Sequence, residues 1–225
     1  MFCRKIIVLS STLLQEDGRF GNFEDGMYIG GQVRIEAAVH IAQKYPLIEF
    51  TLASGYNKSG HGDIETSEKV DQMAAFILAR APMANIQKVY SLPCTYHNFV
   101  AALRRYRSSF ESQEVGILTN EYHLRRALEF ANLAAQTLGY TEQSKFIPIA
   151  AEEVLSLQIR AIIGERTGEY AERVRSEAHG LKQLRAGLYE DSCLTRNFAS
   201  LRHIIKKHGK VLLTDEELDS LRGKL

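Results

Sequence analysis

The 225-residue chain contains no tryptophan, only three cysteines and four prolines, and almost no net charge. Cys3, Cys94 and Cys193 are odd in number, lie far apart and form no C-x-x-C pair, so we expect reduced thiols in a cytoplasmic protein. The 28 basic residues nearly balance the 27 acidic ones, which leaves a net charge of +1. This balance excludes the global positive field that would hold a nucleic acid or an anionic membrane.

Long apolar runs are also missing from the sequence. Its longest apolar stretches have the length of a strand, and Met1–Lys5 leads into Ile6–Leu9 without an extended hydrophobic region. We therefore expect neither a membrane span nor a signal peptide. A basic cluster at Arg202–Lys210 is interpreted as a solvated helix face in preference to a nucleic-acid contact. The expected partner is a small-molecule ligand.

Short apolar, β-branched runs alternate with amphipathic stretches over the first two thirds of the chain, as in a parallel sheet with helical crossovers. Several runs are continuously apolar, which is expected where both faces of a sheet are covered. The sequence therefore predicts an α/β fold, a Rossmann-like three-layer sandwich with a mainly parallel five-stranded sheet. The expected strands are Lys5–Ser10, Ile48–Ser54, Ile86–Ser91, Glu114–Thr119 and Lys145–Ile149, and the expected helices between them are Gln32–Lys44, Glu65–Arg80, Thr95–Ser108 and Glu121–Leu138.

The alternation stops after Ile149, and the remaining residues have mostly helical periodicity. We expect residues 1–150 to form the Rossmann-like domain. Residues 151–225 would form a C-terminal helical extension, which packs on that domain or at the interface of a homodimer. The segment Leu14–Gly31 has no clear period and predicts a loop or short lid above the first strand.

The expected topology selects candidate site residues by position alone. In an open parallel sheet the carboxyl ends of all strands meet at one edge, where ligands bind against the amino ends of the following helices. We therefore expect polar residues that follow the strands to lie close together. These residues are Ser10 and Ser11, Ser54 and Gly55, Thr95 and Asn98, and Thr119, Asn120, His123 and Arg126.

His123 and Arg126 are three residues apart in a first helical turn, so they share a face that suits phosphate, sulfate or carboxylate. A structural interpretation, in which the two form a surface ion pair or the histidine is buried and bonded to a carbonyl, has equal weight from the spacing alone. Thr95 and Asn120 fit ordinary helix N-caps, and Asn98 could bond locally.

Cys94 stands near the same edge, and a helix N-terminus there could activate its thiol. A packed, inert cysteine is the favoured interpretation, and nucleophilic catalysis by Cys94 with His97 or His123 as base is the weaker one. Without such a role, His97 is expected to be exposed or to cap the helix. No G-x-G-x-x-G, Walker loop, H-E-x-x-H or G-x-S-x-G pattern occurs, so no dinucleotide fingerprint and no metal are predicted.

Several motifs in order resemble those of the YdcF-like family, a domain of largely unknown function shared by YdcF, SanA and ElyC. Its Arg-x-x-x-Ala helix resembles Arg34–Ala38, and the first two residues of its Ser-Gly-Gly strand end are Ser54–Gly55. A Ser-Glu pair opens the next helix at Ser67–Glu68, and Thr95–Asn98 is similar to the family's Thr-x-Glu-Asn. The most specific motif, Val-Thr-Ser-x-x-His-x-x-Arg-Ala, is similar to Leu118–Ala127.

This resemblance covers Lys5 to about Ile149 and implies a Rossmann-like fold with a polar crevice. It implies a nucleotide-like ligand, with S-adenosylmethionine as one candidate, and supplies no established reaction. Two residues depart from the family pattern: His97 stands where the family has Glu, and Tyr56 replaces the second Gly. SanA and ElyC resemble membrane-anchored proteins, so a chain without an anchor is expected to belong with the cytoplasmic YdcF branch.

The leading hypothesis is a protein that binds a small anionic or nucleotide-like ligand at the strand-carboxyl edge and transfers or hydrolyses a phosphoryl or glycosyl group. Arg126 would hold the anion, and His123 would act as general acid or base. Thr95 and Asn98 would orient the ligand, and Glu68 would bind a sugar hydroxyl or act as the second acid-base group. The rival hypothesis is a non-catalytic sensor or assembly protein that acts through its C-terminal helices.

Overall fold

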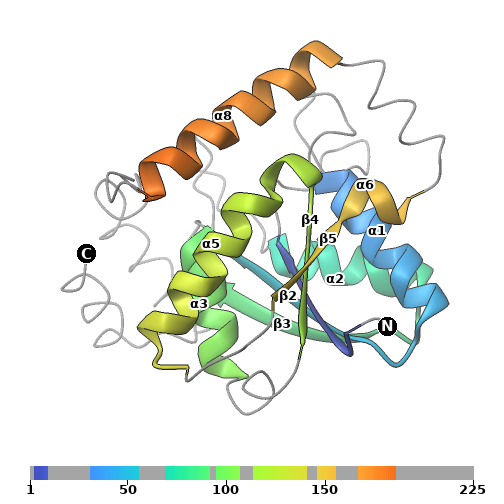
Figure 1. The fold of residues 1–225 in the computed structure, drawn as a ribbon. Helices are drawn as coiled ribbons and strands as arrows, with labels where there is room; N and C mark the ends of the chain where they lie inside the picture. The colour runs from blue at the N-terminus through green and yellow to red at the C-terminus, as the bar shows by residue number, and fades with distance from the viewer. Residues whose placement is uncertain are drawn as a thin grey trace, which may run out of the picture.

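The computed structural model describes residues 3–9, 31–55, 69–91, 95–106, 114–140, 146–155 and 167–185. It contains a five-stranded sheet in which every pairing is parallel, and this confirms the expected α/β class (Figure 1). In order across the sheet the strands are β3 (Asn85–Ser91), β2 (Glu49–Gly55), β1 (Lys5–Leu9), β4 (Val115–Thr119) and β5 (Phe146–Ala150).

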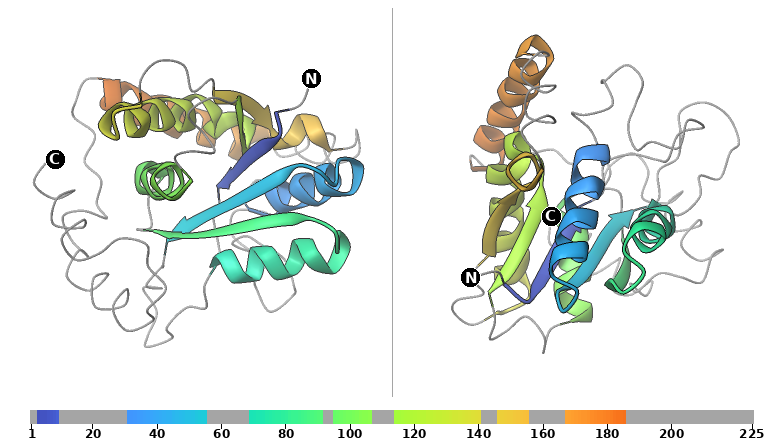
Figure 2. Two further views of the ribbon diagram at one scale, coloured as in Figure 1. Left: turned by 90° about the horizontal axis from the view of Figure 1, so that it is seen from below. Right: turned by 90° about the vertical axis from the view of Figure 1, so that its right-hand side faces the viewer.

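Helices cover both faces of the sheet and give the molecule three layers (Figure 2). One face packs against the helices that follow β1, β2 and β5, and the other packs against those that follow β3 and β4. The described helices are α1 (Gly31–Lys44), α2 (Lys69–Arg80), α3 (Thr95–Arg105), α5 (Glu121–Thr137), α6 (Ala151–Val154) and α8 (Thr167–Arg185).

Strand β1 shows why the apolar runs are continuous. Its Ile6 and Val8 pack on the face covered by α1 and α2, whereas Ile7 and Leu9 pack on the face covered by α3 and α5. Successive side chains of a strand point to opposite faces, so a central strand buries every residue. Each fully buried side chain of this size contributes about 1.5–3 kcal/mol of hydrophobic stabilisation.

The strand order reverses between β1 and β4, which lie side by side at the centre of the sheet. From β1 the chain moves outward through β2 to β3, and it then returns by way of α3 to β4 on the other side. Crevices for ligands form at such a reversal, outside the carboxyl ends of the strands. The carboxyl edge of this sheet consists of the ends of β1 at Leu9, β2 at Gly55, β3 at Ser91, β4 at Thr119 and β5 at Ala150.

Helix α8 lies beside α5, on the outer side of the layer that α5 and α3 form (Figures 1 and 2). A Cβ atom on Gly180 would lie 3.4 Å from Cδ of Arg126, so the glycine lets the two helices approach closely. Helices α6 and α8 are the described part of the C-terminal extension, and the domain boundary at residue 150 stays a prediction. Within the described ranges, none of the helices combines the length and apolar character that crossing a membrane requires.

Candidate functional site

The polar side chains that are buried in the described part of the chain gather at the carboxyl edge of the sheet. Thr51, in the middle of β2, is the exception among them. All the others belong to a strand end or to the first turn of a helix that follows a strand. They are Gln32 and Arg34 in α1, Ser54 in β2, Ser91 in β3, His97 and Asn98 in α3, Thr119 and Asn120 at the end of β4, His123 in α5 and Glu152 in α6.

Three of these residues form a switch-point network, which consists of Arg34, Asn120 and Glu152. Arg34 donates from Nη1 to the carbonyl oxygen of Leu9 at 3.2 Å and from Nε to Asn120 Oδ1 at 2.5 Å, so it bridges the ends of β1 and β4. Asn120 in turn donates from Nδ2 to Glu152 Oε1 at 2.9 Å. The network therefore ties together three adjacent strand ends at the reversal of the strand order.

This network corrects the N-cap interpretation of Asn120. The residue occupies the cap position of α5, but its side chain makes no capping hydrogen bond. Glu152 satisfies the helix start instead, because its Oε2 accepts from the amide of Glu121 at 2.8 Å. A carboxylate beside the positive end of α5 is electrostatically favourable, and it leaves the Asn120 oxygen available for Arg34.

A second group, the His123 cluster, comprises Thr95, His123, Arg126 and Glu177. Nδ1 of His123 lies 3.0 Å from Glu177 Oε2, and its Nε2 lies 3.5 Å from Thr95 Oγ1. Arg126 binds the same carboxylate through two donors, Nε at 2.5 Å and Nη2 at 2.8 Å. The cluster therefore links the first turns of α3 and α5 to the middle of α8.

The shared face of His123 and Arg126 is as the spacing predicts, since Arg126 Nη2 lies 3.3 Å from His123 Nδ1. The group that meets this face, however, is Glu177 of α8. Two donors of the Arg126 guanidinium already bind a carboxylate, so an anionic ligand would compete with Glu177 for them. Glu177 thus neutralises the Arg126 charge that the sequence predicts to bind a ligand.

Burial lowers the pKa of His123 below its ordinary value of 6.5, because the charged imidazolium would lose its hydration. The charges of Arg34 and Arg126 act in the same direction, and Glu177 opposes them. For Glu177, burial alone would raise the pKa, but its bonds to His123 and Arg126 outweigh burial and lower the pKa below 4.5. Near neutral pH the cluster therefore holds a neutral imidazole beside an ionised carboxylate.

Thr119 and Thr51 offer a contrast within the sheet. Both are buried, and the hydroxyl oxygen of each has no hydrogen-bond partner among the described residues. Thr119 ends β4 at the polar edge, whereas Thr51 lies in mid-strand opposite Ile7 of β1 and Gln87 of β3. A buried unpaired hydroxyl is costly, so Thr119 has a chemical reason to bond a ligand.

The remaining predicted site residues have different placements. Ser54 is buried near the end of β2, which Gly55 completes. Asn98 is buried and accepts a hydrogen bond from the Ser91 hydroxyl, as the local interpretation predicts. The residues Ser10, Ser11, Tyr56, Glu68 and Cys94, the segment 14–30 and the cluster Arg202–Lys210 lie outside the described residues.

The expectation that His97 is exposed or caps the helix is wrong in its first part, because the residue is fully buried. Its imidazole meets the ring of Tyr96 edge to face, with 5.2 Å between the ring centroids. The YdcF-like pattern has Glu at this position. The carboxylates at this edge of the structure belong to Glu152 and Glu177 instead.

Sequence reasoning missed both of these glutamates. Glu152 follows β5 directly, so the same strand-end rule that selected Asn120 applies to it. Glu177 has no comparable signal, because it lies in mid-helix and reaches the site only through the packing of α8 on α5.

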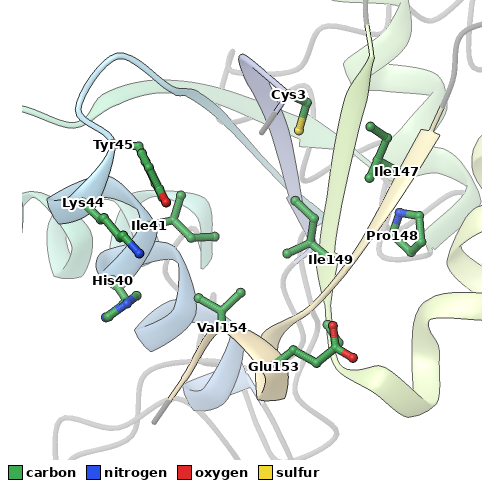
Figure 3. A pocket seen from close by; sticks show the side chains of 11 residues that line it. Cys3, His40, Ile41, Lys44, Tyr45, Ile147, Pro148, Ile149, Glu153 and Val154 are labelled. Atoms are coloured by element: carbon green, nitrogen blue, oxygen red, sulfur yellow. The ribbon is translucent and has the colours of Figure 1, made fainter. Parts of the chain in front are cut away.

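A cavity of about 430 Å³ lies elsewhere, between α1, β5 and α6 (Figure 3). Ile41 of α1 faces Ile149 of β5 across it, while Lys44 and Glu153 are its charged side chains. Cys3 is also part of the lining, and burial raises the pKa of its thiol. None of the predicted site residues lines this cavity. Among the described residues, no group of three or more His, Cys, Asp or Glu side chains is placed to hold a metal ion.

In comparisons with known proteins, no family model matches the chain, and neither a curated protein nor a solved structure matches it at the significance level required. The site is therefore interpreted from its own geometry and chemistry.

Proposed function

We propose that this chain is a YdcF-like protein that binds a small anionic or nucleotide-like ligand at the carboxyl edge of the sheet, beside β1 and β4. We further propose that it transfers or hydrolyses a phosphoryl or glycosyl group of that ligand. The main support is the gathering of buried polar side chains at this edge, within an interior that is otherwise almost wholly apolar. Burying a polar group without a hydrogen-bond partner is costly, and the Thr119 hydroxyl at this edge has none among the described residues.

The individual roles follow from the contacts of each residue. The Thr119 hydroxyl would bond the ligand, and the amides at the start of α3 would face its anionic group. His123 would act as the general acid or base, since it is a buried imidazole at this edge and its pKa is lowered by burial. Arg126 would favour the anion through its charge, because Glu177 holds two of its donors.

Native mass spectrometry of the freshly purified chain tests the binding proposal. The protein would be examined for a co-purifying molecule and then with S-adenosylmethionine, nucleotides, sugar nucleotides and sugar phosphates. Thr119→Val removes only the unpaired hydroxyl, so the loss of one ligand hydrogen bond should weaken binding about fivefold. Thr51→Val is the matched control, because it removes an equally buried hydroxyl away from the edge.

We expect a bound species in the wild type and in Thr51→Val, and less of it in Thr119→Val, His123→Ala and Arg126→Ala. The reaction assay is then chosen by the chemical class of that species. A ligand whose affinity and turnover are unchanged in His123→Ala would contradict the proposal. A chain that binds nothing in the panel would shift weight to a protein partner.

The sensor hypothesis has one observation in its favour, which is the direct bond between the edge and α8. Through Glu177, the position of α8 depends on His123 and Arg126. A ligand that disturbs this pair would change the packing of α8. Hydrogen exchange of the α8 amides with and without a bound compound tests this idea, and unchanged exchange would leave the sensor function without support.

A further inference from the structure

His123 has two nitrogens, and the proposed function, on which the following proposal rests, requires that one of them accept a proton. The imidazole has a different neighbour at each nitrogen. Nδ1 faces the Glu177 carboxylate at 3.0 Å, and Nε2 faces the Thr95 hydroxyl at 3.5 Å. Arg126 Nη2 also lies 3.3 Å from Nδ1, but it already donates to Glu177 Oε1 at 2.8 Å, so the nearest group at Nδ1 is the carboxylate, which only accepts. The Thr95 hydroxyl at Nε2 can donate or accept.

These neighbours select one neutral tautomer. If Nδ1 lacked a proton, its lone pair would face the lone pairs of Glu177 Oε2 across 3.0 Å. With the proton on Nδ1, the imidazole donates to the carboxylate, and Arg126 keeps its own bonds to Glu177 at 2.5 and 2.8 Å. Nε2 is then unprotonated and accepts from the Thr95 hydroxyl.

We propose that Glu177 is a positioning residue that holds His123 in the Nδ1–H tautomer, and that Nε2 is thereby the proton-accepting nitrogen of the site. Thr95 provides the hydroxyl at Nε2 when the site is at rest. When a ligand binds, the group at Nε2 is a hydroxyl of that ligand or a water molecule. The substrate class is therefore one in which an O–H group attacks a phosphoryl or glycosyl centre.

The proton balance of such a step is complete within the cluster. In phosphoryl transfer the O–H proton passes to Nε2 while the oxygen forms a bond to phosphorus. The imidazolium that results still donates its Nδ1 proton to the Glu177 carboxylate, whose negative charge stabilises the imidazolium. The bond from phosphorus to the leaving oxygen then breaks, and the proton on Nε2 moves to that oxygen.

Helix α8 thus contributes Glu177 to the proton-transfer site, although the helix lies outside the sheet. Glu177 is 16% exposed and His123 7% exposed at their side chains, so water competes little for the bond between them. The same carboxylate is fixed by two donors of Arg126, which prevents it from rotating away from the imidazole. At many reactive sites a carboxylate likewise accepts from Nδ1–H of a histidine and so fixes the tautomer and orientation of the ring.

The test is the protonation state of each His123 nitrogen, measured by long-range 1H–15N correlation spectra of the 15N-labelled full chain. His123→Gln assigns the resonances among the seven histidines. At pH 7 we expect the Nδ1 resonance in the range of a protonated nitrogen and the Nε2 resonance in that of an unprotonated one. A wild-type protein with the Nε2–H tautomer would overturn the proposal.

Variants at Glu177 show whether the carboxylate is the cause. In Glu177→Leu we expect the two resonances to exchange ranges, because Arg126 Nη2, at 3.3 Å, becomes the neighbour that donates to Nδ1. Glu177→Gln keeps an acceptor oxygen, so the tautomer should persist while the midpoint of His123 titration falls. Glu172→Leu, at an exposed position of α8, is the control and should keep the wild-type pattern.

If Glu177→Leu fails to fold, the wild-type spectrum and Glu177→Gln still decide the question. An unchanged tautomer in a folded Glu177→Leu variant would refute the positioning role. These spectra contain no ligand, so their failure is separate from that of the proposed function, which the mass spectrometry tests.

Discussion

The switch-point network and the His123 cluster are built from similar parts, yet they differ in what they hold. Each contains an arginine and a glutamate that both contact one further residue, Asn120 in the first group and His123 in the second. Arg34 and Glu152 lie in the first turns of α1 and α6, whereas Arg126 lies in α5 and Glu177 in the middle of α8. In the switch-point network the Asn120 amide bridges the two charged side chains, whereas in the His123 cluster Arg126 and Glu177 bond each other directly and both contact the imidazole.

The two groups therefore have different roles: the switch-point network supports the fold, and the His123 cluster controls the position of a proton. The Asn120 side chain does not titrate, so the hydrogen bonds that join it to Arg34 and Glu152 only fix the strand ends and the start of α5. His123 can gain and lose a proton, and its surroundings hold it neutral. A buried network that only fixes geometry should appear in stability measurements, whereas one that sets a proton position should also appear in spectra and pH profiles.

The largest effect on stability is expected for Glu152→Ala. The substitution removes the acceptor of two hydrogen bonds, from Asn120 Nδ2 and the Glu121 amide, and leaves the buried Arg34 charge less compensated. We expect a loss of about 3–5 kcal/mol in the free energy of unfolding, measured by urea denaturation. Glu153→Ala is the control, since this neighbour is exposed and should change stability by less than about 0.5 kcal/mol. Equal effects of the two variants would refute the supporting role of the network.

A smaller loss is expected for Glu177→Ala, because the Arg126 side chain is 20% exposed and water replaces part of what is lost. We expect a decrease of about 1.5–3 kcal/mol, with faster hydrogen exchange along α8. The exposed Glu172→Ala on the same helix should leave both quantities near their wild-type values. If Glu177→Ala destabilised the chain more than Glu152→Ala, the proposed contrast between the two groups would be wrong.

The His123 cluster should also make stability depend on pH. Because burial lowers the pKa of folded His123 below 6.5, the unfolded chain binds more protons, and stability falls as the pH drops below 6.5 toward that lowered value. Glu177 adds a second loss as the pH falls below 4.5, since its folded pKa is lowered as well. His123→Gln should therefore flatten the unfolding profile just below pH 6.5, whereas the exposed His40→Gln should not. A profile that His123→Gln leaves unchanged would contradict the burial of a neutral imidazole.

The smallest effects are expected for the two unpaired threonines. Thr51→Val and Thr119→Val each remove a buried hydroxyl without a partner among the described residues, so stability should stay constant or rise by up to about 1 kcal/mol. Thermal unfolding measures this change. A marked loss of stability in Thr119→Val alone would mean that its hydroxyl supports the fold, and the argument that it serves a ligand would fail.

Much of the fold could be predicted because the information is local. Alternating faces in strands such as Lys5–Leu9 and crossover helices such as Gly31–Lys44 arise from periodicities of a few residues. The family resemblance selected Arg34, and the strand-end rule predicted that Asn120 and His123 would lie at one edge. It needed only the class of the sheet, which the structure confirms.

The partners of those residues could not be predicted in the same way. The position of Glu177 depends on how α8 packs on α5, with Gly180 admitting the close contact, and no short-range pattern encodes that packing. The burial of His97 also depends on tertiary contacts, since its position in a first helical turn is compatible with exposure. For this reason the sequence predicts an anion clamp at Arg126, whereas the structure pairs that arginine with a carboxylate.

The most direct test of the account is where a ligand binds. Methyl NMR spectra of the full chain would be recorded with S-adenosylmethionine, AMP and UDP-glucose in turn. We predict shifts at Leu9 and Thr119, which end the two central strands, and none at Ile41 and Val154, which line the cavity of Figure 3. Shifts confined to Ile41 and Val154, or no shift with any of the three compounds, would contradict a binding site at the carboxyl edge.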